Sequence, residues 1–261
     1  MELITEIKNI VTKAGQIMLG ATDIMSKSSK KTGKHDLVTV YDLKIQSFLS
    51  EKLKNLLPGA VIMGEEDADA YVASTGADDC FIIDPIDGTA NFIFGCRYSA
   101  ISVGLQRKGR TIAGVIYNPY SEEMFWAVAG RGAMLNNTPI RTNNLDLSSS
   151  IVTFGTSPYH RPLAEKTFEI MRTFYSDVLD IRRSGSAALD LCSVACGRSS
   201  LFFELHLSPW DYCAGALIVA EAGGIVTDTD GKPLPYDRPS SVVAGNKTAH
   251  SEFLKRSSNL S

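Results

Sequence analysis

The sequence predicts a mixed α/β protein in two halves, an α+β half over residues 1–145 and a layered αβα half over residues 146–261. Two helical patterns followed by a run of short strand patterns predict the first half, and strand patterns that alternate with helix patterns predict the second. Apolar residues make up 44% of the 261 residues, so the chain can bury a large core, as one big domain or as two smaller ones.

The first half opens with two helices. Apolar residues recur at helical spacing from Leu3 to Met18 and again from about Val40 to Leu57, where Pro58-Gly59 ends the second pattern. The stretch between the helices, from Ser26 to Lys34, is polar and basic, which predicts a loop.

Short strands make up the rest of the first half. The apolar runs Ala60 to Met63 and Cys80 to Ile83 each lead directly into acidic residues. Between Tyr98 and Leu135 the pattern predicts an antiparallel meander, with strands at Ser99 to Gln106, Thr111 to Tyr117 and Met124 to Ala129. The polar stretch from Arg141 to Ser150 lacks periodicity, so we place the domain boundary there.

The second half alternates strands and helices. Strands are expected at Ile151 to Phe154, Val178 to Arg182, Leu201 to Leu205, Ile225 to Thr227 and Val242 to Ala244. Helices are expected at Leu163 to Tyr175, Ser186 to Cys196 and Trp210 to Ala222. The last of these is apolar nearly all round, which is typical of a buried helix.

Charge and hydropathy exclude several classes of protein. A net charge of -3 argues against a nucleic-acid binder, which usually has a basic face. No apolar run approaches the roughly 20 residues of a membrane helix, and the first residues lack the features of a signal peptide, so we expect a cytoplasmic protein without a membrane partner. The 5 cysteines are odd in number and scattered, and the 4 histidines lack ligand spacing, which favours free thiols and packing histidines.

The segment from Asp84 to Thr89 carries the strongest chemical signal. We expect a strand to end at Asp84, Pro85 to turn the chain, and Asp87 to return on the same side. Two carboxylates held so close repel each other unless a cation lies between them, and the carbonyl of Ile86 could join them as an oxygen ligand. Backbone amides of Gly88 and Thr89 would then face an anion at the start of the next helix. The alternative is an ordinary Asp-rich turn that caps a helix.

Other acidic residues could join this site. Glu65 follows a strand and is either part of an exposed acidic turn or a third metal ligand that also contacts the nucleophilic water. Asp42 could cap the second helix or serve as an outer metal ligand. Asp211 opens the apolar helix, where the helix dipole favours it, and from there it could project a carboxylate into a cleft.

Three motifs together resemble the signature of the inositol monophosphatase family: Gly64-Glu65-Glu66, then Asp84-Pro85-Ile86-Asp87-Gly88-Thr89-Ala90-Asn91-Phe92, then Trp210-Asp211-Tyr212-Cys213-Ala214-Gly215. Further family-like segments follow the same order, so that the resemblance covers most of the chain: Asp36-Leu37-Val38-Thr39, Gly185-Ser186-Ala187-Ala188 and Glu221-Ala222-Gly223-Gly224. The resemblance implies a layered αβαβα sandwich of the sugar-phosphatase, fructose-1,6-bisphosphatase-like type.

The resemblance also implies roles for individual residues. Metal ligands for about two to three Mg²⁺ ions would be Glu65, Asp84, the Ile86 carbonyl, Asp87 and Asp211. Catalytic residues would be Glu65, Thr89 and Asp42, with Thr89 and Glu65 holding the attacking water. Substrate contacts would come from Gly88, Thr89, Gly185, Ser186, Ala187, Glu204 and Asp211. Lys31 would belong to a mobile basic loop near the metals, although Lys27, Lys30 and Lys34 lie close by in the sequence and are alternatives.

The expected activity is Mg²⁺-dependent hydrolysis of a small phosphorylated polyol, with inositol monophosphate as the leading substrate. The family resemblance also implies inhibition by Li⁺ and a homodimer. Related phosphatases act on fructose 1,6-bisphosphate, NADP, 3'-phosphoadenosine 5'-phosphate or histidinol phosphate, and these substrates stay open as alternatives. A non-catalytic binder of metal or phosphate on the same fold is a second alternative.

Overall fold

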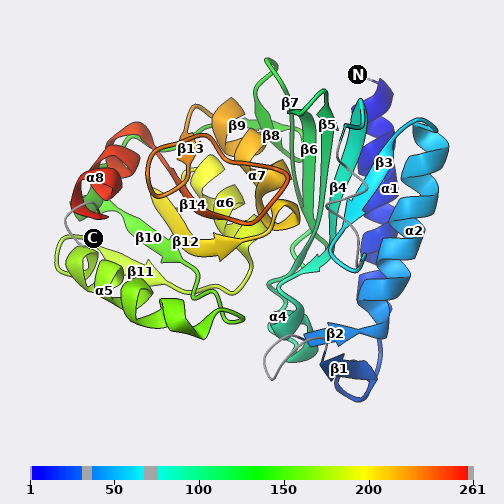
Figure 1. The fold of residues 1–261 in the computed structure, drawn as a ribbon, viewed down its shortest axis with the longest axis horizontal. Helices are drawn as coiled ribbons and strands as arrows, with labels where there is room; N and C mark the ends of the chain where they lie inside the picture. The colour runs from blue at the N-terminus through cyan, green and yellow to red at the C-terminus, as the bar shows by residue number, and fades with distance from the viewer. Residues whose placement is uncertain (1, 31–36, 68–75, 258–261) are drawn as a thin grey trace.

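Helices and sheets alternate in five layers in the computed structural model, which describes residues 2–30, 37–67 and 76–257 (Figure 1). From one side to the other the layers are a helix pair, a large sheet, a second helix pair, a smaller sheet and a third helix pair. The expected αβαβα sandwich is therefore confirmed.

The larger sheet has the strand order β3-β4-β5-β6-β7-β8-β9. Its strands are β3 (Val61–Gly64), β4 (Asp79–Asp87), β5 (Ala100–Arg107), β6 (Arg110–Asn118), β7 (Glu123–Val128), β8 (Ala133–Leu135) and β9 (Thr138–Ile140). Strands β3 and β4 are parallel and every later pair is antiparallel, which confirms the meander. Two short strands, β8 and β9, extend it beyond the strands expected from the sequence.

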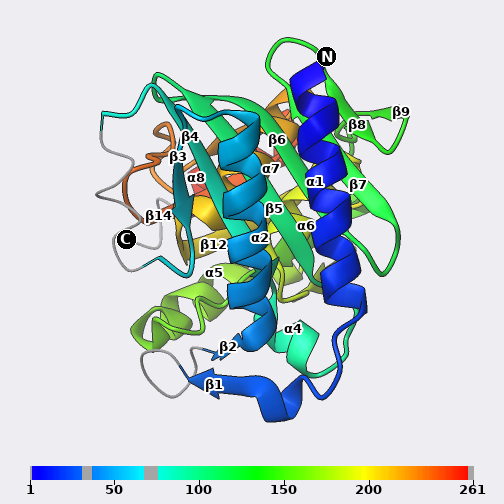
Figure 2. The same cartoon turned by 90° about the vertical axis from the view of Figure 1, so that its right-hand side faces the viewer.

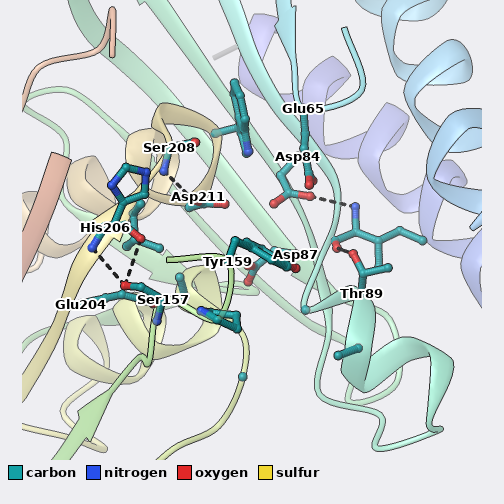
Figure 3. A pocket seen from close by; sticks show the side chains of 18 of the residues that line it. Glu65, Asp84, Asp87, Thr89, Ser157, Tyr159, Glu204, His206, Ser208 and Asp211 are labelled. Carbon is teal, nitrogen blue, oxygen red and sulfur yellow. Dashed lines mark hydrogen bonds between the residues drawn. The ribbon is translucent and has the colours of Figure 1, made fainter. Parts of the chain in front are cut away.

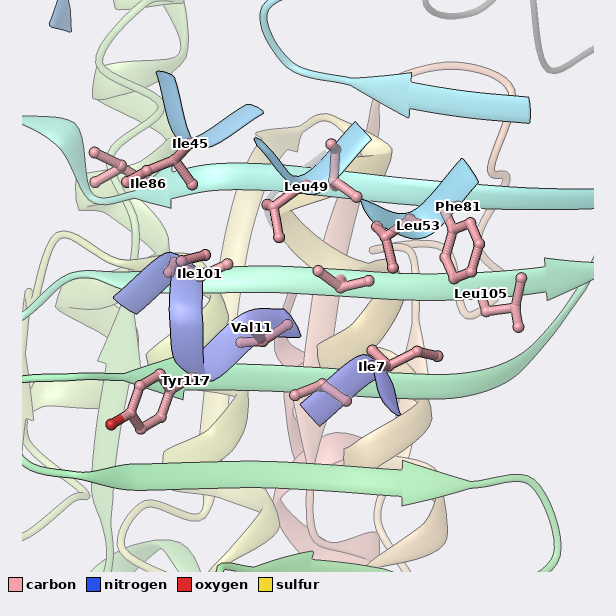
Figure 4. Close-up of a cluster of buried hydrophobic side chains, with 14 of the residues drawn as sticks. Ile7, Val11, Ile45, Leu49, Leu53, Phe81, Ile86, Ile101, Leu105 and Tyr117 are labelled. Atoms are coloured by element: carbon pink, nitrogen blue, oxygen red, sulfur yellow. The ribbon is translucent and has the colours of Figure 1, made fainter. Parts of the chain in front are cut away.

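The outer face of this sheet is covered by α1 (Glu2–Leu19) and α2 (Val40–Leu56), as Figure 2 shows. Apolar side chains of both helices meet those of β4, β5 and β6 in one core, which includes Ile7, Val11, Ile45, Leu49, Leu53, Phe81, Ile101 and Leu105 (Figure 4). Each fully buried side chain of this kind contributes about 2 kcal/mol by leaving water. The core therefore forms a rigid support behind β4.

The segment between these helices corrects one expectation. A short helix η1 (Met25–Lys27) is followed by β1 (Ser28–Lys30), which pairs antiparallel with β2 (Leu37–Thr39). The prediction of a loop from Ser26 onward was therefore wrong for β1, because two short polar strands joined by backbone hydrogen bonds show no hydrophobic alternation. Lys31 and Lys34 lie outside the described residues.

The smaller sheet has the strand order β11-β10-β12-β14-β13. Its strands are β10 (Ile151–Phe154), β11 (Asp180–Arg182), β12 (Leu201–Leu207), β13 (Ile225–Thr227) and β14 (Ser240–Gly245). Strands β11, β10 and β12 are parallel, so their carboxyl ends lie at one edge, whereas β14 is antiparallel to both of its neighbours.

Helices cover both faces of the smaller sheet. Between the two sheets lie α6 (Ala187–Ala195) and α7 (Pro209–Glu221), and α7 is buried on nearly every side, as its apolar sequence predicts. The opposite face carries α5 (Ala164–Tyr175) and α8 (Lys247–Ser257), the second of which was not expected. The remaining short helices are α4 (Thr89–Ile93), η2 (Leu147–Ser149) and η3 (Arg161–Leu163).

Both sheets contribute to the core around α6 and α7. The larger sheet ends at Ile140 and the smaller one begins at Ile151, so the sheets change over within the predicted boundary. Because α6 and α7 pack against both sheets, the two sheets are held together by a shared core. The division into two domains stays a prediction.

Candidate functional site

Acidic side chains from three separate stretches of the chain meet in one cavity of about 750 Å³ (Figure 3). Carboxylate oxygens of Asp84, Asp87 and Asp211 all lie within 4.8 Å of one another. Glu65, at the end of β3, lines the same cavity. The structure thus brings together the four carboxylates that the sequence singled out as metal ligands.

A local irregularity in β4 places Asp84 and Asp87 on the same side. Asp84 pairs with Ser102 but Asp87 pairs with Ala100, so β4 holds one more residue than β5 over this stretch. Residues three apart in a regular strand face opposite sides, and the extra residue restores a common side. The expectation that the strand ends at Asp84 was wrong, because β4 continues through this bulge to Asp87. The amide of Ile86 donates to Asp84 Oδ1 at 2.9 Å and fixes the turn.

Asp211 serves two purposes at the start of α7. Its Oδ2 accepts the amide hydrogen of Ser208 at 2.7 Å in a capping box, so the local interpretation as a helix cap holds. Its carboxylate also reaches the cavity beside Asp84 and Asp87. The same residue therefore accepts a hydrogen bond from a backbone amide at the start of a buried helix and also completes the acidic cluster.

Burial and mutual repulsion disfavour the charged forms of these carboxylates. Burial raises the pKa of Asp84 well above its usual value, and the charges of Glu65, Asp87 and Asp211 add to the rise. Burial likewise raises the pKa of Asp211 well above its usual value. The pKa of Asp87 rises to about 6 through burial, even though Ser186 and Ala188 donate hydrogen bonds to its carboxylate. A bound cation would relieve this cost.

Gly88 and Thr89 form the junction between β4 and α4. Gly88 has φ +85°, a left-handed conformation that glycine adopts without strain. The hydroxyl of Thr89 lies 3.1 Å from the Ile86 carbonyl and 3.3 Å from Asp42 Oδ1, and these two acceptors share its single hydrogen. Thr89 is therefore held with its side chain at the edge of the acidic cluster.

Asp42 is fully buried beneath Thr89. Its Oδ2 accepts the amide hydrogen of Thr39 at 2.8 Å, and the two residues form the capping box of α2. Asp42 does not line the cavity that the described residues form. Of its two alternative roles, the structure shows the helix cap, and it adds a hydrogen bond to Thr89 that the sequence did not reveal.

The opposite wall of the cavity belongs to the smaller sheet and α6. Gly185, Ala187 and Glu204 line it, as the resemblance implied. Glu204 Oε1 accepts the amide hydrogen of Ser157 at 2.7 Å, and burial raises the pKa of Glu204 to about 7. The side chain of Ser186 turns instead toward Asp87, to which its hydroxyl donates.

Sequence reasoning missed several residues of this wall. Ser157, Tyr159, His160, Arg183 and His206 all line the cavity. The rings of His160 and His206 lie in contact, with centroids 3.6 Å apart. Their position in the sequence could have predicted them, since most of them lie at or just after the ends of the parallel strands β10, β11 and β12. Ligands bind at the carboxyl ends of the strands in such sheets.

The donor set suits a hard divalent cation. The cluster offers carboxylate oxygens, and Ile86, whose carbonyl is a further oxygen donor, lines the same cavity. Carboxylate and carbonyl oxygens are the ligands that Mg²⁺ prefers. In the part of the chain that the structure describes, no other group of acidic, histidine or cysteine side chains has this spacing. The cysteines are free thiols, as expected.

A model of the inositol monophosphatase family matches residues 1–261. The chain belongs to this family. Nus factor SuhB of Escherichia coli (strain K12), a relative, is 38% identical over 225 residues, which cover 86% of this chain and 82% of that protein.

Solved structures of inositol monophosphatases share the fold. The IMPase of Thermotoga maritima has a TM-score of 0.87 and 31% identity, covering 99% of this chain and 97% of that chain. The staphylococcal SaIMPase-II, solved with inositol monophosphate bound, has a TM-score of 0.80 and 28% identity, covering 98% and 93%. The inositol monophosphatase resemblance is therefore confirmed over the whole chain.

The names of the relatives bear on the expected partners. The name Nus factor, carried by several relatives, weighs weakly against the expectation that nucleic acid is not a partner. None of the helices within the described ranges is long and apolar enough to cross a membrane.

Proposed function

We propose that the protein is a Mg²⁺-dependent phosphomonoesterase that hydrolyses inositol monophosphate, an inositol-1-phosphatase. The observation that carries the proposal is the convergence of Asp84, Asp87 and Asp211 within 4.8 Å in a cavity that Glu65 also lines. The inositol monophosphate bound to SaIMPase-II supports the choice of substrate.

The acidic cluster would hold the metal ions. Glu65, Asp84, Asp87, Asp211 and the Ile86 carbonyl are the ligands for about two to three Mg²⁺ ions. When bound, such ions neutralise the phosphate, lower the pKa of a bound water and stabilise the leaving alkoxide.

The remaining residues bind and orient the reactants. Glu65 and the hydroxyl of Thr89 hold the attacking water, and Asp42 fixes that hydroxyl by accepting its hydrogen bond. Amides of Gly88 and Thr89 bind the phosphate at the start of α4.

The polyol faces the opposite wall. Gly185, Ala187 and Asp211 contact it, and Glu204 accepts hydrogen bonds from its hydroxyls. Ser186 contributes through Asp87, which its hydroxyl positions.

Phosphate release from a substrate panel tests this proposal. The panel holds inositol monophosphate, fructose 1,6-bisphosphate, NADP, 3'-phosphoadenosine 5'-phosphate, histidinol phosphate and 2'-AMP, each with and without Mg²⁺. We expect Mg²⁺-dependent release that is fastest from inositol monophosphate, and loss of release in Asp87→Asn but not in the control Asp237→Asn, an exposed residue. Faster phosphate release from another substrate would assign the specificity to that substrate. Stoichiometric metal binding without phosphate release from any substrate would show a non-catalytic metal-binding protein.

A second role follows from the relatives named Nus factor SuhB, whose similarity to this chain extends over most of both proteins. We propose that the chain shares that role. Expression in an Escherichia coli strain lacking its own SuhB, with wild-type protein and Asp87→Asn in parallel, tests it. Rescue by both proteins would separate the Nus-factor role from hydrolysis, and rescue by neither would exclude it.

We further propose that the protein is a cytoplasmic homodimer, as the family resemblance implies. Light scattering of the purified protein over a range of concentrations measures the mass directly. A mass near 28.3 kDa at every concentration would show a monomer and contradict the proposal.

A further inference from the structure

The short segment from Ser184 to Ala188 joins β11 to α6 and carries Gly185 into the cavity. We propose that Asn91 and Asp190 are positioning residues that anchor Ser184 and so hold Gly185 against the leaving-group side of the substrate. This inference rests on the proposed phosphatase function.

Asn91 connects the metal-binding motif to this segment. It lies in α4, two residues after Thr89, and its Nδ2 donates to the Tyr98 carbonyl at 2.8 Å and to the Ser184 carbonyl at 2.9 Å. One amide group thus uses both of its hydrogens, and the second bond links Asn91 to a residue 93 positions further along the chain.

Asp190 holds Ser184 from the other side. Its Oδ2 accepts the hydroxyl hydrogen of Ser184 at 2.6 Å, and the Ser184 hydroxyl accepts the amide hydrogen of Ser186 at 3.4 Å. The side chain is 2% exposed, and its Oδ1 is buried without a hydrogen-bond partner among the described residues. A buried orphan oxygen costs stability, so this carboxyl group calls for an explanation beyond core packing.

The anchored segment is closely packed against its neighbours. Gly185 has φ +93°, and a Cβ there would lie 2.6 Å from Arg183 Nη1 and 3.0 Å from Asn91 Nδ2. A Cβ on Gly88 would lie 3.0 Å from the Gly185 carbonyl oxygen. The phosphate-binding turn and the polyol wall therefore touch backbone to backbone, and a displacement of Ser184 passes directly to Gly185.

A separate anchor holds the other end of the segment. Asp87 Oδ2 accepts hydrogen bonds from the Ser186 hydroxyl and, at 2.9 Å, from the amide of Ala188. This contact fixes the start of α6 to a metal ligand and does not involve Asn91 or Asp190. Loosening the Ser184 end should therefore weaken substrate binding while leaving metal binding intact.

Steady-state kinetics of four variants tests the inference. In Asn91→Asp a carboxylate faces two carbonyl oxygens, and in Ser184→Ala the hydrogen bond to Asp190 is lost. For both we expect the KM for inositol monophosphate to rise about tenfold. The loss of one buried hydrogen bond weakens binding by about this factor. The kcat should stay within about threefold and the Mg²⁺ half-saturation should not move. Asp190→Asn, whose amide oxygen still accepts from Ser184, should stay near wild type, as should the control Asn137→Asp at an exposed position.

Hydrogen exchange of the metal-free protein supplies a readout that needs no catalysis. Residues 183–188 should take up deuterium faster in Asn91→Asp and Ser184→Ala than in wild type or the control. An unchanged KM in both variants, or unchanged exchange, would overturn the inference. If the wild-type protein hydrolyses no substrate, the proposed function fails, and the exchange result still decides whether Asn91 and Asp190 anchor the segment.

Discussion

Replacing Asp87 by asparagine should stabilise the metal-free protein while it removes activity. The carboxylate of Asp87 is buried beside Asp84 and Asp211, so its charge is a cost to the fold unless a cation is bound. An asparagine amide oxygen can still accept the hydrogen bonds from Ser186 and Ala188. The variant therefore keeps the local geometry and loses only the charge.

The size of the effect follows from the pKa of Asp87, which burial raises to about 6 from its ordinary value of 3.8. At pH values between about 4 and about 6, the Asp87 carboxyl is ionised in the unfolded chain but stays protonated in the folded protein. The free energy of unfolding therefore falls as the pH rises through this range. A difference of about two pKa units corresponds to about 3 kcal/mol at neutral pH. For a chain of this length that amounts to about 5–10 °C in Tm.

Thermal unfolding in EDTA and in Mg²⁺, at pH 4 and pH 7.5, measures the effect. At pH 7.5 without metal, Asp87→Asn should melt about 5–10 °C above wild type, and at pH 4 the two should nearly coincide. Added Mg²⁺ should raise the Tm of wild type more than that of the variant. A metal-free variant that melts at or below wild type at pH 7.5 would refute the argument that repulsion in the acidic cluster strains the fold.

Three further predictions concern the same cavity. Thr89→Ala should lower kcat about 100-fold without changing the Mg²⁺ half-saturation, because it removes the hydroxyl held by Asp42; a loss below threefold would contradict its role. Gly155→Ala places a Cβ 1.8 Å from Glu204 Oε2, so urea unfolding should show a loss of about 1–3 kcal/mol and the KM should rise; a neutral result would mean that Glu204 moves freely. Li⁺ should inhibit phosphate release, and full activity at high Li⁺ would count against the inositol branch of the family.

Most of the fold could be predicted because burial leaves a periodic pattern in the sequence. The apolar stripe of α1 and the apolar composition of α7 reveal a half-buried and a fully buried helix, and both were located correctly. The strands β1 and β9 were missed, because short, exposed strands bury too little surface to impose a pattern. Helix α8 buries only a few side chains, so its periodicity is weak.

The spatial arrangement of the site could be predicted only for residues that belong to one short sequence motif. Asp84, Asp87 and Thr89 lie within six residues, so their proximity follows from the sequence itself. The convergence of Glu65 and Asp211 with them depends on the packing of α7 against the larger sheet, which local patterns do not encode. Arg183 and His206 were overlooked because each is a single polar residue at a strand end, and only the sheet topology shows that these ends face the same cavity.

The additional residue of β4 beside Ala100 makes the site more sensitive to chain length than to chemistry at that point. The site uses the backbone of Ile86, because its amide donates to Asp84 Oδ1 and its carbonyl accepts from the Thr89 hydroxyl. Removing one of the two residues between Asp84 and Asp87 would return the strand to regular alternation, in which the aspartates still share a side but the turn that carries these backbone contacts is lost. A lineage with this fold can therefore accept apolar substitutions here that keep the turn, whereas a deletion of a single codon would remove the turn and its backbone contacts in one step.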